Sequence, residues 1–147
     1  MHRLVLVGAL CAALAGSGCG GDDEEEYRDG FNEAAETFEK RLTAAGQTMQ
    51  SAGRAKSPEK YAEGVEQLQT AGEDFREDLD DLDPPEDAAS KQKALANAID
   101  QFSTAVGSIN AAVQADDESA IQAESARVQA AGERVDDAIK QVKEAVE

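Results

Sequence analysis

The fold is decided by the stretch YAEGVEQLQTAGEDFREDLDDL at residues 61–82. Within it an apolar or small residue recurs at every third or fourth position, and the positions between are mostly polar or charged. Side chains spaced in this way lie on one face of an α-helix, so the stretch predicts a helix with a single buried stripe. The stripe consists of Tyr61, Val65, Leu68, Gly72, Phe75, Leu79 and Leu82.

The same spacing recurs in three further stretches. Of the 23 Leu, Ile, Val, Phe, Met and Tyr residues after Cys19, only Tyr27 falls outside the four stripes. The high charge and the scarcity of large apolar residues favour disorder by themselves, but a disordered chain has no reason to keep apolar residues in register. The other stripes are Phe31, Ala35, Phe38, Leu42, Ala45, Met49 and Ala52; Leu95, Ile99, Phe102, Val106, Ile109 and Val113; and Ile121, Ser125, Val128, Gly132, Val135, Ile139, Val142 and Val146.

Short segments between the stripes carry the signals of helix ends and starts. Ser57 is a typical N-cap and Pro58 suits a first helical position. Prolines within Asp83–Asp87 end one helix and begin the next, and Asp116–Ser119 supplies a carboxylate cap. Because these connections are short, successive helices should be antiparallel, which predicts an all-α, up-down four-helix bundle. The predicted helices are residues 27–54, 58–82, 86–115 and 117–146.

The alternative arrangement is two long helical hairpins whose core is completed only in a homodimer. A weak internal similarity favours paired hairpins, although such a match also arises by chance in helices rich in Ala, Gln and Glu. Sixty residues separate the matching positions, which are Gln69, Ala71, Gly72 and Glu73 in one half and Gln129, Ala131, Gly132 and Glu133 in the other.

Residues 1–26 are organised differently. A short basic start precedes an apolar run from Leu4 to Leu14, which is followed by small residues, by Cys19 and by the acidic string Asp22–Glu26. About a dozen apolar residues are too few to cross a hydrocarbon core of ~30 Å as a helix. The run therefore predicts an export signal and not a membrane span.

This order of parts resembles the signal peptide of bacterial lipoproteins. The resemblance implies that residues 1–18 are removed and that Cys19 receives a diacylglyceryl thioether. Residues 19–26 would then form an acidic tether to a bundle at residues 27–147. The protein would be exported and held by its lipid on the extracytoplasmic face of the cell membrane.

One residue departs from the lipoprotein pattern, and one alternative processing site exists. Gly16 stands three positions before the cysteine, where an aliphatic residue is usual. Ala13-Leu14-Ala15 is an ordinary signal-peptidase site, and cleavage after Ala15 would release a soluble protein with a free thiol at Cys19.

The charge of the chain limits its partners. Its formal net charge is −17, and it becomes −18 when residues 1–18 are removed, because they contain one arginine and no acidic residue. Such a surface repels phosphate, which argues against binding to nucleic acid or anionic lipid. It favours cationic partners or divalent ions.

The chain is poorly supplied with catalytic groups. Its one histidine, His2, lies in the predicted signal peptide, and the predicted bundle has neither Cys nor Trp. Zinc, haem and di-iron sites need His or Cys ligands, and Ser or Thr nucleophiles would lack a histidine base. We therefore expect a lipid-anchored bundle with a binding or structural role in the cell envelope, with no enzymatic activity and no cofactor.

An acidic turn between the second and third predicted helices is the densest chemical feature. Ca²⁺ prefers several carboxylate and carbonyl oxygens as ligands, so one interpretation of this turn is a divalent-cation site. The turn lacks the residue spacing of an EF-hand, so the other interpretation is a solvated acidic loop. The up-down topology would bring this turn, the start of the first helix and the C-terminus to one end. Anionic lipid would repel that end unless divalent ions bridged the two. The candidate ligands are Asp78, Asp80, Asp81, Asp83, Glu86 and Asp87.

Two glycines occupy stripe positions at mid-height in the predicted bundle. A glycine inside a helix costs about 1 kcal/mol relative to Ala, so we expect a compensating role. One interpretation is close packing, with Phe102 filling the space beside both glycines. The other is a pocket for a small apolar ligand, formed by Gly72, Phe102, Ser125 and Gly132.

Overall fold

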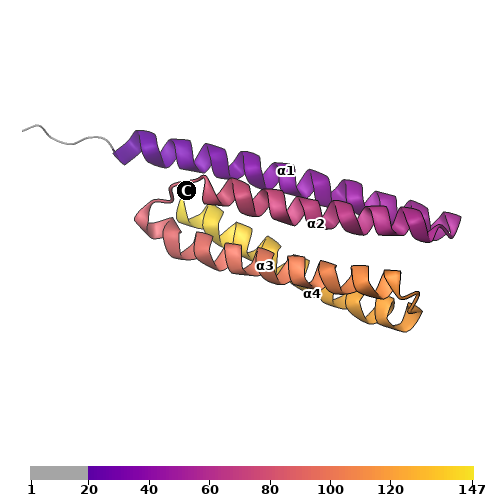
Figure 1. Cartoon of the computed structure of the whole chain (residues 1–147). Helices are drawn as coiled ribbons and strands as arrows, with labels where there is room; N and C mark the ends of the chain where they lie inside the picture. The colour runs from indigo at the N-terminus through magenta and orange to yellow at the C-terminus, as the bar shows by residue number, and fades with distance from the viewer. Residues whose placement is uncertain (1–19) are drawn as a thin grey trace, which may run out of the picture.

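The computed structural model describes residues 20–147 of the chain. These residues form four α-helices in succession, so the all-α prediction is confirmed. The predicted signal peptide and Cys19 lie outside the described residues. The helices are α1 (Gly20–Ala55), α2 (Pro58–Asp80), α3 (Glu86–Gln114) and α4 (Glu118–Ala145), as drawn in Figure 1.

The helix ends lie close to the predicted ends, with one exception. α2, α3 and α4 begin and end within two residues of the predicted positions. α1, however, begins at Gly20, so the prediction of a tether was wrong for residues 20–26. The acidic residues Asp23–Glu26 lie in the first turns of α1, where the positive end of the helix dipole stabilises carboxylates.

The two hairpin turns are closed by the residues that the sequence marks as caps. Ser57 Oγ accepts a hydrogen bond from Lys60 N (3.3 Å), and Asp117 Oδ1 accepts one from Ala120 N (2.9 Å). At the start of α3, Pro85 makes no side-chain cap. The two caps satisfy N–H groups that a helix start leaves unpaired, which fixes where α2 and α4 begin.

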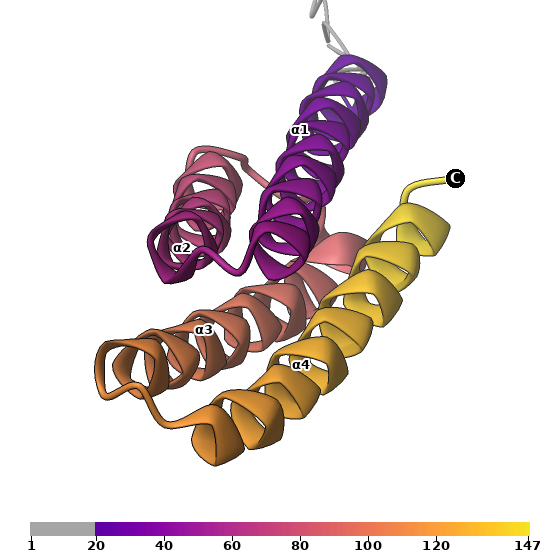
Figure 2. The same ribbon diagram turned by 90° about the vertical axis from the view of Figure 1, so that its right-hand side faces the viewer.

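The helices form two antiparallel hairpins, α1–α2 and α3–α4, which pack against each other chiefly through α2 and α3. α1 and α4 have little contact. Figure 1 shows the hairpins close together at the end that holds the C-terminus and the α2–α3 connection, and Figure 2 shows the two hairpin tips apart. The structure is a four-helix bundle, as predicted, but it is closed at one end and splayed at the other.

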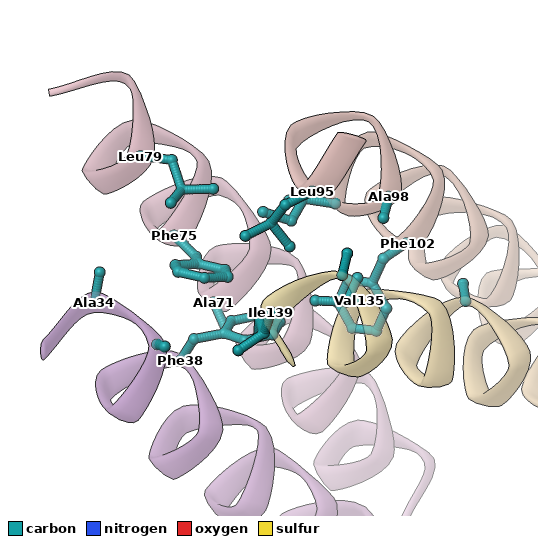
Figure 3. Packing of buried hydrophobic residues seen from close by; sticks show 14 of the residues in the cluster. Ala34, Phe38, Ala71, Phe75, Leu79, Leu95, Ala98, Phe102, Val135 and Ile139 are labelled. Carbon is teal, nitrogen blue, oxygen red and sulfur yellow. The ribbon is translucent and has the colours of Figure 1, made fainter. Parts of the chain in front are cut away.

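Three phenylalanines join the two hairpins in the core. Phe38 of α1 stacks on Phe75 of α2, with 4.6 Å between ring centroids, and meets Phe102 of α3 edge-on at 6.1 Å. Each of these side chains is at most 2% exposed. Val135 and Ile139 of α4 belong to the same cluster (Figure 3), so all four helices contribute to one core.

Burial along α4 decreases toward the splayed end. In α4, Val135 and Val142 are buried, whereas Ile121 and Val128 of the same predicted stripe are only half-buried. Tyr61, near the start of α2, is also half-buried. The stripe of α4 is therefore buried from Val135 to Val142 and only half-buried toward the hairpin tip.

The two hairpins are structural repeats offset by sixty residues. In the first turn Ser57 N donates to Ala52 O (3.0 Å), and in the second Asp117 N donates to Ala112 O (3.2 Å). Polar pairs across each hairpin follow the same offset. The weak similarity in the sequence thus corresponds to a repeated structure. The two pairs are Arg41 with Asp74 and Gln101 with Arg134.

Substitution of two glycines should report how closely the helices pack. A Cβ at Gly64 would overlap the Met49 side chain and lie 3.2 Å from the backbone oxygen of Ala45, whereas a Cβ at Gly132 would meet no atom within 4 Å. We expect Gly132→Ala to raise the free energy of unfolding by about 0.5–1 kcal/mol through helix propensity. Gly64→Ala should lower it, because the α1 backbone cannot yield without opening the hairpin. Urea unfolding of both variants measures this, and a stabilising Gly64→Ala would contradict the close α1–α2 contact.

Candidate functional site

The splay leaves a cleft between the two hairpin tips, which we call the tip cleft. Its volume is about 520 Å³, and each hairpin supplies one wall. Tyr61 and Ile121 lie in opposite walls at repeat-equivalent positions. The lining residues are Ala52, Gly53, Lys56, Ser57, Pro58, Tyr61, Val113, Asp116, Glu118 and Ile121.

The tip cleft exposes apolar surface for which the bundle provides no partner. Tyr61, Val113 and Ile121 are half-buried, although each occupies a predicted stripe position. Apolar surface left in water forgoes roughly 25 cal/mol per Å² of burial free energy. Concave sites with apolar walls and a few polar groups are the usual form of ligand sites, which makes the tip cleft the candidate functional site.

A second hollow, the α1–α4 groove, follows the open side of the bundle. Its volume is about 550 Å³. Desolvation raises the pKa of Asp136; nearby Lys140 lowers it, and the charge of Glu39 on α1 raises it further. Two like charges on facing helices oppose a closer approach of α1 to α4. The groove is lined by Glu39, Leu42, Thr43, Asp136, Ile139, Lys140 and Lys143.

Neutralising Asp136 should therefore stabilise the bundle. Folding raises the pKa of this carboxyl, so its charged form lowers the free energy of unfolding at any pH above that pKa. Well below the ordinary Asp pKa of ~3.9 the carboxyl is protonated in both the folded and the unfolded chain, and the cost disappears. We expect Asp136→Asn to raise the melting temperature at neutral pH and to lose this advantage near pH ~3. Asp137→Asn is the comparison variant: Asp137 pairs with Lys140 (3.4 Å) and raises the pKa of Asp136 less than Glu39 does, so we expect a smaller change in melting temperature. An Asp136→Asn variant that melts no higher than wild type at neutral pH would refute the repulsion.

The predicted mid-bundle pocket of Gly72, Phe102, Ser125 and Gly132 is not supported. A Cβ at Gly72 would lie 3.4 Å from Phe102 Cδ1, so that space is filled. Gly132 is half-buried and a Cβ there would meet nothing within 4 Å. Ser125 Oγ donates within its own helix. Phe102 thus packs beside Gly72, as the packing interpretation predicted, but not beside Gly132, whose stretch of α4 packs less tightly than the closed end.

The closed end of the bundle collects acidic residues, as the topology predicted. The start of α1, the α2–α3 connection and the C-terminus lie side by side around two hollows. We call this region the acidic end. Its acidic residues include Asp23, Glu24, Glu26, Asp81, Asp83, Glu86, Asp87 and Glu147.

The divalent-cation site predicted at this turn is not supported. Within residues 20–147, no three His, Cys, Asp or Glu side chains are grouped so that they could hold a metal ion. The candidates are spread over the end of α2, a non-helical connection and the start of α3. All six are exposed: Asp78, Asp80, Asp81, Asp83, Glu86 and Asp87.

Sequence reasoning missed a polar link near the acidic end. Tyr27 Oη donates to Gln92 Oε1 (2.7 Å), and Gln92 Nε2 donates to Leu79 O (2.8 Å) and Leu82 O (3.4 Å). The Gln92 amide thus bonds to carbonyls in the last turn of α2 and in the connection that follows it. Tyr27 lies four residues before Phe31, so extending the first stripe by one turn would have included it.

The described part of the chain contains no helix long and apolar enough to cross a membrane. No family model, no curated protein and no solved structure matches the chain.

Proposed function

We propose that the chain is a lipid-anchored helical-bundle protein of the cell envelope, with a binding or structural role and no catalytic activity. A diacylglyceryl group on Cys19 would hold it on the extracytoplasmic face of the membrane. The observation that carries the proposal is the order of residues 1–19, in which a basic start, a short apolar run and small residues lead to a cysteine. Two acyl chains anchor a protein stably, whereas a single chain binds only marginally.

The arrangement of the bundle gives the proposed anchor a consequence for the tip cleft. α1 begins at Gly20, the residue after Cys19, and its start belongs to the acidic end. The tip cleft lies at the opposite end of helices of up to 36 residues. At 1.5 Å per residue, a bundle standing on its acidic end would hold the tip cleft roughly 50 Å from the bilayer. The site would then face envelope components and not the lipid.

The charge supports a restricted set of partners. Anionic lipid headgroups would repel the acidic end, so we expect the anchored bundle to make no close contact with an anionic membrane surface. For the same reason we propose no nucleic acid as a partner, and we favour partners with cationic surfaces.

The tip cleft favours a second candidate function, the binding of a small apolar ligand. Its apolar walls, which include Tyr61, Val113 and Ile121, supply the surface that such a ligand would cover. This site replaces the mid-bundle position expected from the glycines. A ligand bound there only in the folded state would raise the melting temperature in proportion to its concentration and affinity.

Removal of the acyl-accepting sulfur tests the proposed anchor. We expect wild-type protein to sediment with membranes and the Cys19→Ala variant to move to the soluble extracytoplasmic fraction. Cys11→Ala is the matched control, because Cys11 lies in the segment that would be removed, and it should stay with the membrane. A wild type that is soluble would overturn the proposal and favour cleavage after Ala15. A Cys19→Ala variant that stays on the membrane would overturn the anchor as well.

A further inference from the structure

The two hairpin tips share a backbone conformation and differ in charge. Residues 54–60 and 114–120 are repeat equivalents with the same turn hydrogen bonds. We call residues 54–60 the basic tip, because they are net positive in a chain of net charge −17. We call residues 114–120 the acidic tip, because they contain acidic residues and no basic residue. The charged residues are Arg54, Lys56, Glu59 and Lys60 in the basic tip and Asp116, Asp117 and Glu118 in the acidic tip.

These opposite charges share the tip cleft. Lys56 contributes to one wall, and Asp116 and Glu118 contribute to the other. Among the described residues, no salt bridge joins the two tips. Unlike charges at such a surface attract over a Debye length of ~10 Å at 0.1 M salt, so the attraction across the cleft depends on ionic strength.

The backbone at Lys56 gives an independent observation. Lys56 has φ 50°, and its equivalent Asp116 has φ 53°. Asp enters this left-handed region readily, but for most other residues it costs roughly 1–2 kcal/mol. Strain of this kind is concentrated at functional positions. Gly or Asn would close the turn at lower cost, but neither would bring a positive charge to the cleft.

We propose that the two hairpins close over the tip cleft, with the basic tip moving against the acidic tip. Lys56 then pairs with Asp116 and Glu118, and Tyr61 packs against Ile121. The phenylalanines packed at mid-bundle, together with the closed end beyond them, act as the hinge. Closure buries the apolar walls that the splayed form leaves half-exposed, and salt weakens it. The proposal goes beyond the proposed function and does not depend on acylation of Cys19.

A distance measurement between the tips tests closure. Nitroxide labels at Ala55→Cys and Ala115→Cys occupy exposed, repeat-equivalent positions. They are placed in the full chain with Cys11→Ala and Cys19→Ala, and pulsed electron resonance gives the distance between them. We expect a shorter mean distance at ~20 mM than at ~500 mM NaCl. Lys56→Glu should lengthen the low-salt distance and remove the salt effect, and adding Asp116→Lys should restore both.

A second variant separates charge from backbone strain. Lys56→Gly relieves the strain and removes the charge, so it should raise the melting temperature and still lengthen the low-salt distance. Distances that are the same at both salt concentrations, in wild type and in Lys56→Glu, would overturn the proposal. A chain labelled at Ala55→Cys alone gives a distance only if two copies associate. A defined distance in that sample at low salt would also overturn the proposal, because the tips would then pair between copies.

Discussion

Phe75→Ala is expected to lower the free energy of unfolding by about 3–5 kcal/mol, the usual cost of removing a buried aromatic side chain. Phe75 is 1% exposed and its ring stacks on Phe38 at 4.6 Å. Through Phe38 it is linked to Phe102, so the cavity would open where α1, α2 and α3 meet. Neighbouring side chains cannot fill it without moving the hairpins relative to each other.

Urea unfolding followed by circular dichroism measures this loss. Ile121→Ala is the control, because Ile121 is half-buried in the tip cleft and has little packing to lose. We expect it to cost about 1 kcal/mol. Equal losses in the two variants would show that side chains pack as tightly at the hairpin tips as around the three phenylalanines.

Tyr27 should make the bundle lose stability at alkaline pH. Burial raises the pKa of Tyr27 from its ordinary 10.0 to about 12. Below pH ~10 both the folded and the unfolded chain hold the proton; above it the unfolded chain releases the proton first, so stability falls as pH rises. Each pH unit between the two values removes about 1.4 kcal/mol, which gives a loss of roughly 2–3 kcal/mol by pH ~12.

The comparison of two Tyr→Phe variants isolates this effect from the titration of lysines. Tyr27→Phe should begin about 1 kcal/mol less stable, because it loses the hydrogen bond to Gln92, and should then show a shallower alkaline decline than wild type. Tyr61→Phe, at the only other tyrosine, should keep the wild-type decline. Unfolding in denaturant at pH ~9 to ~12 measures both, and parallel curves for Tyr27→Phe and wild type would contradict the burial of Tyr27.

The positions of the helices could be predicted because their signals are local. Apolar spacing fixes the face of each helix, and caps such as Ser57 and Asp117 fix where α2 and α4 begin. The start of α1 was missed because two glycines and a run of acids are typical of a tether, although the same acids suit the first turns of a helix.

The splay could not be predicted because it depends on contacts between helices. The stripe of α4 continues unchanged from Val142 to Ile121, yet only its C-terminal half is buried. The repulsion of Glu39 and Asp136 and the link between Tyr27 and Gln92 join residues far apart in the chain. Periodicity within one helix contains no information on such pairs.

Among the candidate sites too, those set by topology could be predicted and those set by contacts between helices could not. Topology alone predicted the acidic end, because an up-down bundle brings alternate connections to one end. Proximity in sequence suggested a cation site at Asp78–Asp87, but among residues 20–147 no three such side chains are grouped so that they could hold a metal ion. The tip cleft was missed, because it exists only where the hairpins separate.

The measurement that tests the central claim most directly is the intact mass of the protein purified from its host's membranes, together with that of the Cys19→Ala variant. We predict a wild-type chain that begins at Cys19 and carries the added mass of a diacylglyceryl group, and a variant without that mass. A wild-type chain that begins near Gly16 with no added mass would contradict the account. The protein would then be a secreted bundle with a free thiol.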